Sequence, residues 1–404
     1  MGDDLPTPGR PAAEGFANLI PKVVIVTEII APYRIPVLNA LAKRAEIELE
    51  VVFLSENDPT LREWKVYKDD IKFNYRVLPS WRQRVGRYNL LINRGVHSAL
   101  RSIKPDVVLC GGYNYLASWL AAFWARSHRV PLLLWSESTA WDRRHEYLLV
   151  ELMKARFLNS CAAFVVPGKS SLNYLTNLGI SKKKIFTARN AVDNVLFSKL
   201  ADSARQDESR EGGRRRFPSR YFLYVGRLVK DKGVFDLLDA YARLDAGIRS
   251  EVSLVFAGTG SDSGRLVDRA AKISPGTIQF PGFVHREELP KIYAFADALI
   301  FPTHSDPWGL VVNEAMACSL PVILTSVAGC AADLVQDGWN GFVVPPRDIS
   351  QLTLAMASVA QDSAKRTEMG RRSREHIEAY SPDRWASGII EAVESVARES
   401  YPQA

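Results

Sequence analysis

The sequence predicts an α/β protein with two domains, each a doubly wound parallel sheet with helices on both faces. Short runs rich in Val, Ile and Leu alternate with segments of helical spacing along most of the 404 residues. Most of these runs are apolar at nearly every position, which is typical of parallel strands that helices cover on both faces. The alternation is interrupted once, around residues 201–220, and then resumes. The chain therefore divides into two units of similar size.

The first unit opens with the strand-like run KVVIVTEI at residues 22–29, and IPVLNALAKR follows it with helical spacing. Further strands are expected at 47–54, 106–112, 131–138 and 163–168. Helices are expected at 88–103, 116–127, 146–159 and 170–177. This repetition of strand, helix and strand predicts a parallel sheet.

The second unit follows a charged stretch with a Gly-Gly pair, residues 201–220, which predicts a linker or mobile loop. Strands are expected at 221–228, 253–260, 277–283, 298–303, 321–326 and 341–346, and consecutive helices over 349–398. The predicted organisation is a disordered leader over 1–20, an N-terminal domain over 21–195, a linker over 196–220, a C-terminal domain over 221–381 and a helical end over 382–404. Ligands of open parallel sheets bind at the carboxyl ends of the strands, so a cleft between the two sheets is the expected site.

Composition excludes several classes of protein. The chain is 47% hydrophobic and 24% charged, as in soluble globular proteins, and no apolar run approaches the ~20 residues that span a bilayer. The N-terminus lacks the basic start and apolar core of a secretory signal. The four cysteines, Cys110, Cys161, Cys318 and Cys330, are far apart, which argues against a disulfide scaffold or zinc site and favours reduced thiols in the cytoplasm.

The net charge of +7 is concentrated between Ile71 and Pro105, where eight basic residues occur and no acidic one. Such a segment attracts phosphates, nucleic acid or an anionic membrane surface. The helix expected at 88–103 combines apolar and basic positions, so it either lies on the cytoplasmic face of an anionic membrane or covers the sheet with its charges in water. No nucleic-acid-binding module surrounds the segment, so nucleic acid is not an expected partner.

The motif GRLVKDKG directly follows YFLYV, the apolar part of the strand expected at 221–228. Gly226 lets the backbone approach a ligand closely, and Arg227 and Lys232 lie five residues apart on a turn that opens a helix. Both cations can reach an anion at the carboxyl end of the strand. The alternative is a solvated turn with two surface cations.

A second motif, PTHSDPWGLVVNEAMACSLPVI, spans residues 302–323. Asp306 lies in a loop before a helix, and the backbone N–H groups of Trp308, Gly309, Leu310 and Val311 form an expected anion site at the helix start. Glu314 follows in the second turn, among apolar residues that call for a polar partner. Alternatively, Asp306 is only an N-cap and Glu314 a surface residue.

These segments together resemble the retaining glycosyltransferases of the GT-B fold, family 4. The resemblance is carried by GRLVKDKGVFDLLDAYARL, FAGTG and DPWGLVVNEAMA, and also by APYRIPVLNALA and ARNAVDNVLF near the start and middle of the chain. It covers the chain from about residue 22 to the C-terminal helices. The combined motifs are specific, although none would be so alone.

The resemblance implies a role for each matching residue. Arg227 and Lys232 would hold the donor's diphosphate, Glu314 the nucleotide ribose, and Asp306 the hydroxyls of the donor sugar. The other donor-binding positions implied are Gly226, Gly258, Gly260, Phe283, Val284, Trp308, Gly309, Leu310 and Val311. The final helix, from about residue 382, would cross back to the N-terminal domain. Asp306 stands where the family usually has Glu.

The expected reaction is the transfer of a sugar from a UDP- or GDP-sugar to a glycan, a lipid-linked acceptor or a small molecule. The chain contains no Asp-x-Asp motif, so we expect no metal ion and no cofactor besides the nucleotide-sugar co-substrate. No carboxylate is placed for a double displacement, which favours substitution on the face that the leaving group vacates. Tyr33, Arg34 and Glu137 follow strand ends of the first domain and are the candidate acceptor-binding residues.

Two other functions stay open. The altered loops and Asp306 fit a catalytically weak homologue that only binds nucleotide sugars. A sugar-nucleotide epimerase on the same fold would act without an acceptor. An NAD-dependent oxidoreductase is disfavoured because AGTGSDSG does not fit G-x-G-x-x-G.

Overall fold

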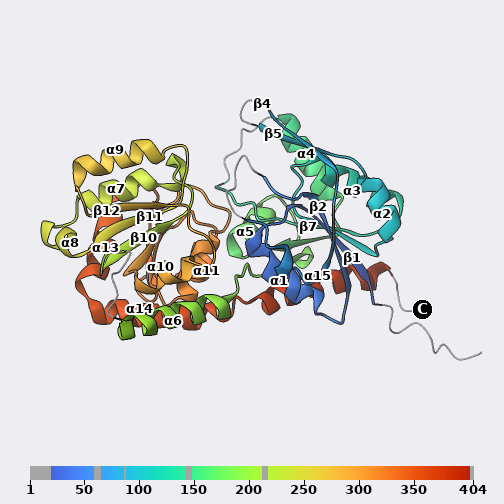
Figure 1. Cartoon of the computed structure of the whole chain (residues 1–404). Coiled ribbons are helices and arrows are strands. Elements are labelled where there is room, and N and C mark those ends of the chain that lie inside the picture. Colours follow the sequence, from blue (N-terminus) through green and yellow to red (C-terminus); the bar gives the residue numbers. More distant parts are fainter. Residues whose placement is uncertain (1–19, 59–64, 86–87, 142–147, 212–216, 401–404) are drawn as a thin grey trace, which may run out of the picture.

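The computed structural model describes residues 20–58, 65–85, 88–141, 148–211 and 217–400. Two α/β domains lie side by side, and the long C-terminal helices run beneath both of them (Figure 1). Each domain contains one parallel sheet. The predicted fold class is confirmed.

The N-terminal sheet has seven strands in the order β3-β2-β1-β6-β7-β8-β9, and every pair in it is parallel. The strands are β1 (Lys22–Ile29), β2 (Glu48–Ser55), β3 (Asn74–Val77), β6 (Val107–Cys110), β7 (Leu132–Trp135), β8 (Ala163–Val166) and β9 (Ile185–Thr187). The helices are η1 (Pro32–Arg34), α1 (Ile35–Ala42), η2 (Lys68–Asp70), α2 (Val96–Ile103), α3 (Leu116–Ser127), α4 (Leu148–Asn159), α5 (Lys169–Asn177) and η3 (Lys182–Lys184). The central strands are buried on both faces, as their apolar runs predict.

The helix expected at 88–103 is wrong in its first half. Strands β4 (Ser80–Val85) and β5 (Tyr88–Asn93) pair antiparallel, and helix α2 begins only at Val96, after Gly95 with φ +88°. The apolar side chains of α2 pack into the core, so its basic residues point outward. The apolar face of this helix is thus already covered by the rest of the domain.

The C-terminal sheet has six strands in the order β12-β11-β10-β13-β14-β15. The strands are β10 (Tyr221–Val225), β11 (Ser253–Ala257), β12 (Ile278–Gly282), β13 (Ala298–Phe301), β14 (Val322–Thr325) and β15 (Gly341–Val344). The helices around the sheet are η4 (Lys230–Lys232), α7 (Val234–Ala242), α8 (Ala246–Glu251), α9 (Ser263–Ile273), α10 (Leu289–Phe295), α11 (Leu310–Ala317), α12 (Ala331–Leu334), α13 (Ile349–Gln361) and α14 (Ser363–Ile377).

The loop predicted at 201–220 is largely helical instead. Helix α6 runs over Asn194–Glu211 and packs against α10 and α11. Its contact face consists of Phe197, Ala201 and Ala204, at helical spacing. The surrounding charges hide this narrow stripe in the sequence, and Arg205 further ties the helix to the domain through the carbonyls of Ala294 and Cys318.

The last helix, α15 (Pro382–Ser400), leaves the C-terminal domain and packs against α1, β8 and β9 of the N-terminal domain (Figure 1). Trp385 is fully buried there, with its ring 5.1 Å from that of Trp135. The four cysteines are buried and unpaired. Among the described residues, no helix combines the length and the apolarity needed to cross a membrane.

We predict that Trp385→Ala lowers the free energy of unfolding by about 3–5 kcal/mol, the usual cost of truncating a buried aromatic residue. Denaturant titration measures it. The matched control is Arg384→Ala, an exposed neighbour on the same helix, which should change stability by less than about 0.5 kcal/mol. Equal stability of the two variants would show that α15 does not hold the N-terminal core.

Candidate functional site

Lys232 and Asp306 form an ion pair where the loops after β10 and β13 meet. The Lys232 Nζ atom lies 2.7 Å from Asp306 Oδ2 and donates to the carbonyl of Ser305 at 2.9 Å. Gly233 makes this approach possible: its φ is +70°, and a Cβ there would lie 1.9 Å from the carbonyl oxygen of Pro302. The two predicted residues are therefore brought together, on loops in tight contact.

The other oxygen of Asp306 orients the start of helix α11. Asp306 Oδ1 accepts a hydrogen bond from the backbone N–H of Trp308 at 3.1 Å. Helix α11 begins at Leu310 after Gly309, whose φ is +98°, so Asp306 is not its N-cap. Within the described residues, the amides of Gly309, Leu310 and Val311 donate to no acceptor. An anion can thus bind at this helix start.

Trp308 differs from its predicted role as one of the amides that bind an anion. Its backbone N–H already donates to Asp306, and its side chain is buried. The indole Nε1 donates to Asn313 Oδ1 at 2.9 Å. Trp308 supports the helix start rather than offering a free donor.

Arg227 is exposed, and its guanidinium donates no hydrogen bond within the described part of the chain. Its backbone carbonyl accepts from the buried hydroxyl of Tyr224 at 2.8 Å, which fixes the turn. The structure thus brings Lys232 to the loop before α11 and leaves Arg227 on the surface, with no anionic partner among the residues that the structure describes.

The glycines after β10 and β11 allow the two loops that contain them to pack against each other. A Cβ on Gly258 would lie 1.9 Å from the carbonyl of Gly226, and a Cβ on Gly260 would lie 2.3 Å from that of Leu228. The two loops therefore lie directly against each other. Phe283 and Val284 follow β12 and are half-buried, with Phe283 5.1 Å from His285 in an edge-on ring contact. The roles predicted for these residues toward a nucleotide stay predictions.

Glu314 has the polar partner that its apolar surroundings require. The Tyr293 hydroxyl, from α10, donates to Glu314 Oε2 at 2.8 Å. Burial raises the pKa of Glu314 to about 7, and the bond from Tyr293 partly opposes that rise. This carboxyl group therefore changes its charge near neutral pH.

Arg34 and Glu137, the predicted acceptor-side residues, also form an ion pair. Arg34 Nη2 lies 2.5 Å from Glu137 Oε1, and the guanidinium lies over Trp135, 4.1 Å from its ring centroid. Tyr33 packs on the same guanidinium at 5.4 Å. The three residues thus gather at the carboxyl edge of the N-terminal sheet.

Two buried asparagines, which the sequence analysis missed, connect these two regions. Asn190 donates to Glu137 Oε1 at 2.9 Å, and its backbone carbonyl accepts from Asn313 Nδ2 at 2.9 Å. Asn313 in turn accepts from Trp308, beside the start of α11. The chain of bonds crosses the domain boundary from the Arg34–Glu137 pair to the Lys232–Asp306 loop. The only sign of this chain of bonds in the sequence is Asn313, a polar residue on the apolar side of α11.

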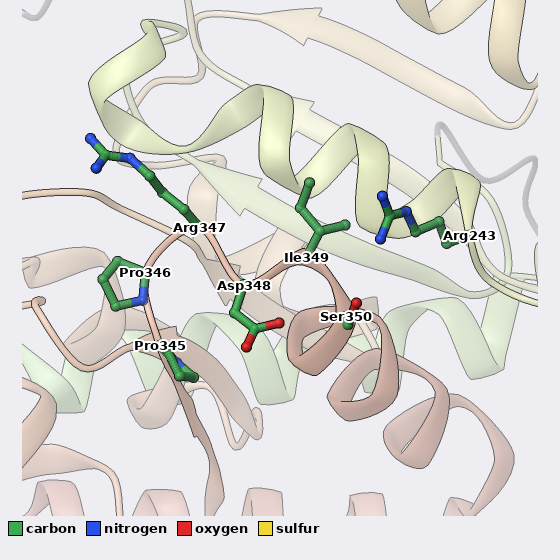
Figure 2. A pocket seen from close by; sticks show the side chains of 7 residues that line it. All are labelled: Arg243, Pro345, Pro346, Arg347, Asp348, Ile349 and Ser350. Atoms are coloured by element: carbon green, nitrogen blue, oxygen red, sulfur yellow. The ribbon is translucent and has the colours of Figure 1, made fainter.

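One depression in the surface lies apart from the residues described above. A shallow depression between α7 and α13 is lined by Arg243 and by residues 345–350, none of them a predicted site residue (Figure 2). No group of three His, Cys, Asp or Glu side chains within the described ranges is arranged to hold a metal ion.

Family models match both domains. Residues 205–376 match the family described as Glycosyl transferases group 1, and residues 37–195 match Glycosyltransferase Family 4. The chain belongs to the family 4, or group 1, glycosyltransferases. The predicted resemblance is therefore confirmed at the level of the family.

Similar proteins include a glycogen synthase of Mycobacterium tuberculosis, 27% identical over 69% of this chain. A GDP-mannose-dependent alpha-mannosyltransferase of Corynebacterium glutamicum is 27% identical over 68% of it. The matched regions span 65% and 63% of these relatives' own lengths. The solved structure of Anabaena HepE in complex with UDP-glucose matches 93% of this chain and all of that one with a TM-score of 0.72, at 18% identity, so the two share the GT-B fold.

We predict that Glu314→Gln is more stable than the wild type above pH 7, and that the difference disappears toward pH 4.5. The folded-state pKa of about 7 exceeds the ordinary 4.5, so the folded protein binds the extra proton between these values and loses stability as pH rises through them. The gain at pH 8 should be on the order of 1–3 kcal/mol. Thermal unfolding across pH measures it. With the exposed Glu391→Gln as control, a gain that does not vary with pH would contradict the assignment.

Proposed function

We propose that the protein is a retaining glycosyltransferase that moves a sugar from a UDP- or GDP-sugar to an acceptor without a metal ion. The observation that carries the proposal is the Lys232–Asp306 pair beside a helix start whose amides at Gly309, Leu310 and Val311 donate to no acceptor among the described residues. Family membership and relatives named as a glycogen synthase and a GDP-mannose-dependent mannosyltransferase support it. HepE, of the same fold, was solved with UDP-glucose.

The pyrophosphate of the donor would bind at the start of α11. The amides of Gly309, Leu310 and Val311 would hold its oxygens, and Lys232 and Arg227 would neutralise its charge. The ribose hydroxyls would donate to Glu314, on the second turn of the same helix. Each protein group here acts on a charge that grows as the nucleotide leaves, so electrostatics and positioning supply the rate.

The bond between the anomeric carbon and the phosphate oxygen would break with its electron pair staying on the nucleoside diphosphate. The acceptor oxygen would bond the anomeric carbon on the same face and pass its proton to the departing phosphate. Both oxygens of Asp306 are engaged, by Lys232 and by the Trp308 amide, so it is poorly placed as a covalent nucleophile. This favours front-face substitution over double displacement.

On the acceptor side, Arg34, Tyr33 and Glu137 would orient a glycan, a lipid-linked acceptor or a small molecule. Glu137 Oε1 accepts from both Arg34 and Asn190, which holds the side chain in one orientation. The buried, unpaired cysteines fit a reducing compartment, so we place the reaction in the cytoplasm.

The second candidate is a protein that binds nucleotide sugars with little turnover. One observation favours it: the ammonium group of Lys232, which a pyrophosphate would need, is already paired with Asp306. Turnover of Asp306→Glu against the wild type separates the two: a large gain with the longer side chain supports the weak homologue, and equal or lower turnover supports the transferase.

We predict that UDP or GDP raises the unfolding temperature, because a ligand at 100 times its Kd stabilises the folded state by about 2.7 kcal/mol. Arg227→Ala and Lys232→Ala should largely lose this shift. Lys230→Ala, an exposed lysine of the same turn, is the matched control and should keep it. If neither nucleotide stabilises the wild type, the donor site is wrong.

With the donor identified by that panel, we expect Arg227→Ala and Lys232→Ala each to lower turnover about 10²-fold or more, the cost of losing one preorganised charge contact. Initial rates of nucleoside diphosphate release measure it. An Arg227→Ala enzyme with unchanged turnover would contradict the role given to that residue.

Turnover should be unchanged after treatment with EDTA and should not rise when Mg²⁺ or Mn²⁺ is added, because protein cations and helix amides supply the positive charge. The same assay before and after chelation tests this expectation. Loss on chelation with recovery on adding a divalent ion would overturn it.

A further inference from the structure

His304 joins the loop that contains Asp306 to the turn that contains Lys232. Its backbone N–H donates to the carbonyl of Asp231 at 3.0 Å. Its imidazole Nε2 lies 2.7 Å from Oδ2 of Asp236, in the first turn of α7. An ionised carboxylate only accepts hydrogen bonds, so Nε2 is the donor of this pair. His304 is thus bonded on both sides of Lys232, to the residue before it and to the fourth residue after it.

The turn that contains Lys232 does not hold its own position. The short helix η4 is three residues long and is followed by Gly233, whose φ is +70°. A helical turn of this length closes few hydrogen bonds, and glycine restricts the backbone least of all residues. Contacts with other segments therefore decide where the ammonium group of Lys232 lies.

The loop that His304 belongs to is itself held firmly. Thr325 Oγ1 donates to the carbonyl of Thr303 at 2.5 Å, and Thr303 Oγ1 donates to the carbonyl of Ser305 at 2.9 Å. Both threonines are buried. Lys232 Nζ donates to the same carbonyl of Ser305, the residue after His304. The loop and the turn thus bond each other in both directions.

The His304–Asp236 pair is largely shielded from solvent. The two side chains are 11% and 22% exposed, so water does not readily replace a bond between them. Asp239, one turn further along α7, instead pairs with Arg269 of α9. An ion pair on this helix therefore does not by itself reach the turn of Lys232, and the bond from His304 is the one that does so.

We propose that His304 and Asp236 are positioning residues that hold the ammonium group of Lys232 in place for an incoming pyrophosphate. A pyrophosphate would compete with Asp306 for that group, and the flexible stem of a lysine can follow either anion. Because His304 anchors the turn at residues 231 and 236, the turn keeps its position while Lys232 exchanges partners, and little reorganisation is needed. This inference rests on the role proposed for Lys232 and adds two residues that act through it.

The first experiment measures the Kd of UDP and of GDP by calorimetry. His304→Ala and Asp236→Ala should each weaken binding about tenfold, the effect of one hydrogen bond to a charged group. His304→Gln keeps an N–H donor near the position of Nε2 and should restore most of the affinity. In the Lys232→Ala background, His304→Ala should have no further effect, whereas in the Arg227→Ala background the loss should persist, because His304 does not act through Arg227.

The second experiment needs no nucleotide. The ion pair couples Lys232 to Asp306, so urea unfolding of the two alanine variants and of their double variant gives a coupling ratio of unfolding constants. Adding His304→Ala to all four proteins should lower this ratio at least about threefold, because the ammonium group is then less well placed. A purely structural bond elsewhere on α7 would lower stability equally in all four and leave the ratio unchanged.

Asp239→Ala is the matched control, since it breaks the pair with Arg269 on the same helix. It should keep the wild-type Kd and the wild-type coupling ratio. If His304→Ala does not fold, Asp236→Asn takes its place, because it keeps the shape of the side chain and removes only the charge.

Three results would overturn the proposal: wild-type nucleotide binding by His304→Ala, an equal loss in the Lys232→Ala background, or an unchanged coupling ratio. If the wild type binds neither UDP nor GDP, the proposed donor site is wrong. The coupling ratio then decides the inference alone, and a lowered ratio would still show that His304 positions Lys232.

Discussion

The ion pair of Lys232 with Asp306 is the interaction on which the geometry of the proposed donor site depends. It joins the loops after β10 and β13, and through the second carboxylate oxygen it also fixes the start of α11. Both side chains are largely buried, so removing either partner would leave an uncompensated charge. An incoming pyrophosphate would add negative charge next to Asp306. Lys232 alone does not balance both anions. Arg227, which is exposed and has no anionic partner in the described part of the chain, and the amides of α11 would supply the remaining positive charge.

A second constraint ties the two domains together. The chain crosses between them at residues 190–194 and again between α14 and α15, and buried polar contacts span the boundary beside these crossings. Asp333 of α12 accepts from the backbone N–H of Lys169 and so caps α5 of the other domain. Gly168 leaves room for it, since a Cβ there would lie 2.6 Å from Asp333 Oδ2. Domain motion would have to break these contacts. Because the interface has a low dielectric constant, leaving the polar groups unpaired there costs free energy, which favours the arrangement seen.

The sequence predicted the elements that follow simple periodicity and missed those that depend on tertiary contacts. Helix 116–127 and the strand at 22–29 were predicted with their observed bounds, because apolar pattern and turn residues agree there. Strand β5 was predicted as the first half of a helix, because only its pairing with β4 reveals it as a strand. At the site, the motifs singled out Lys232 and Asp306 but not the ion pair between them. The bond from Asn313 to Asn190 joins residues 123 positions apart, and no local pattern encodes it.

The hydrogen-bond chain through Asn190 and Asn313 gives a physical reason why the two halves of the proposed site should act as one. If α11 shifts when an anion binds, Asn313 moves with it. Asn313 donates a hydrogen bond to the carbonyl of Asn190 and accepts one from the indole of Trp308. Because both asparagines are buried, a broken bond there is not replaced by water and costs the full desolvation of the group left behind. These bonds therefore tie the Arg34–Glu137 pair to helix α11. When α11 shifts, a slight reorientation of the pair costs less free energy than breaking one of the bonds. An occupied donor site would then set the position of the groups that meet the acceptor.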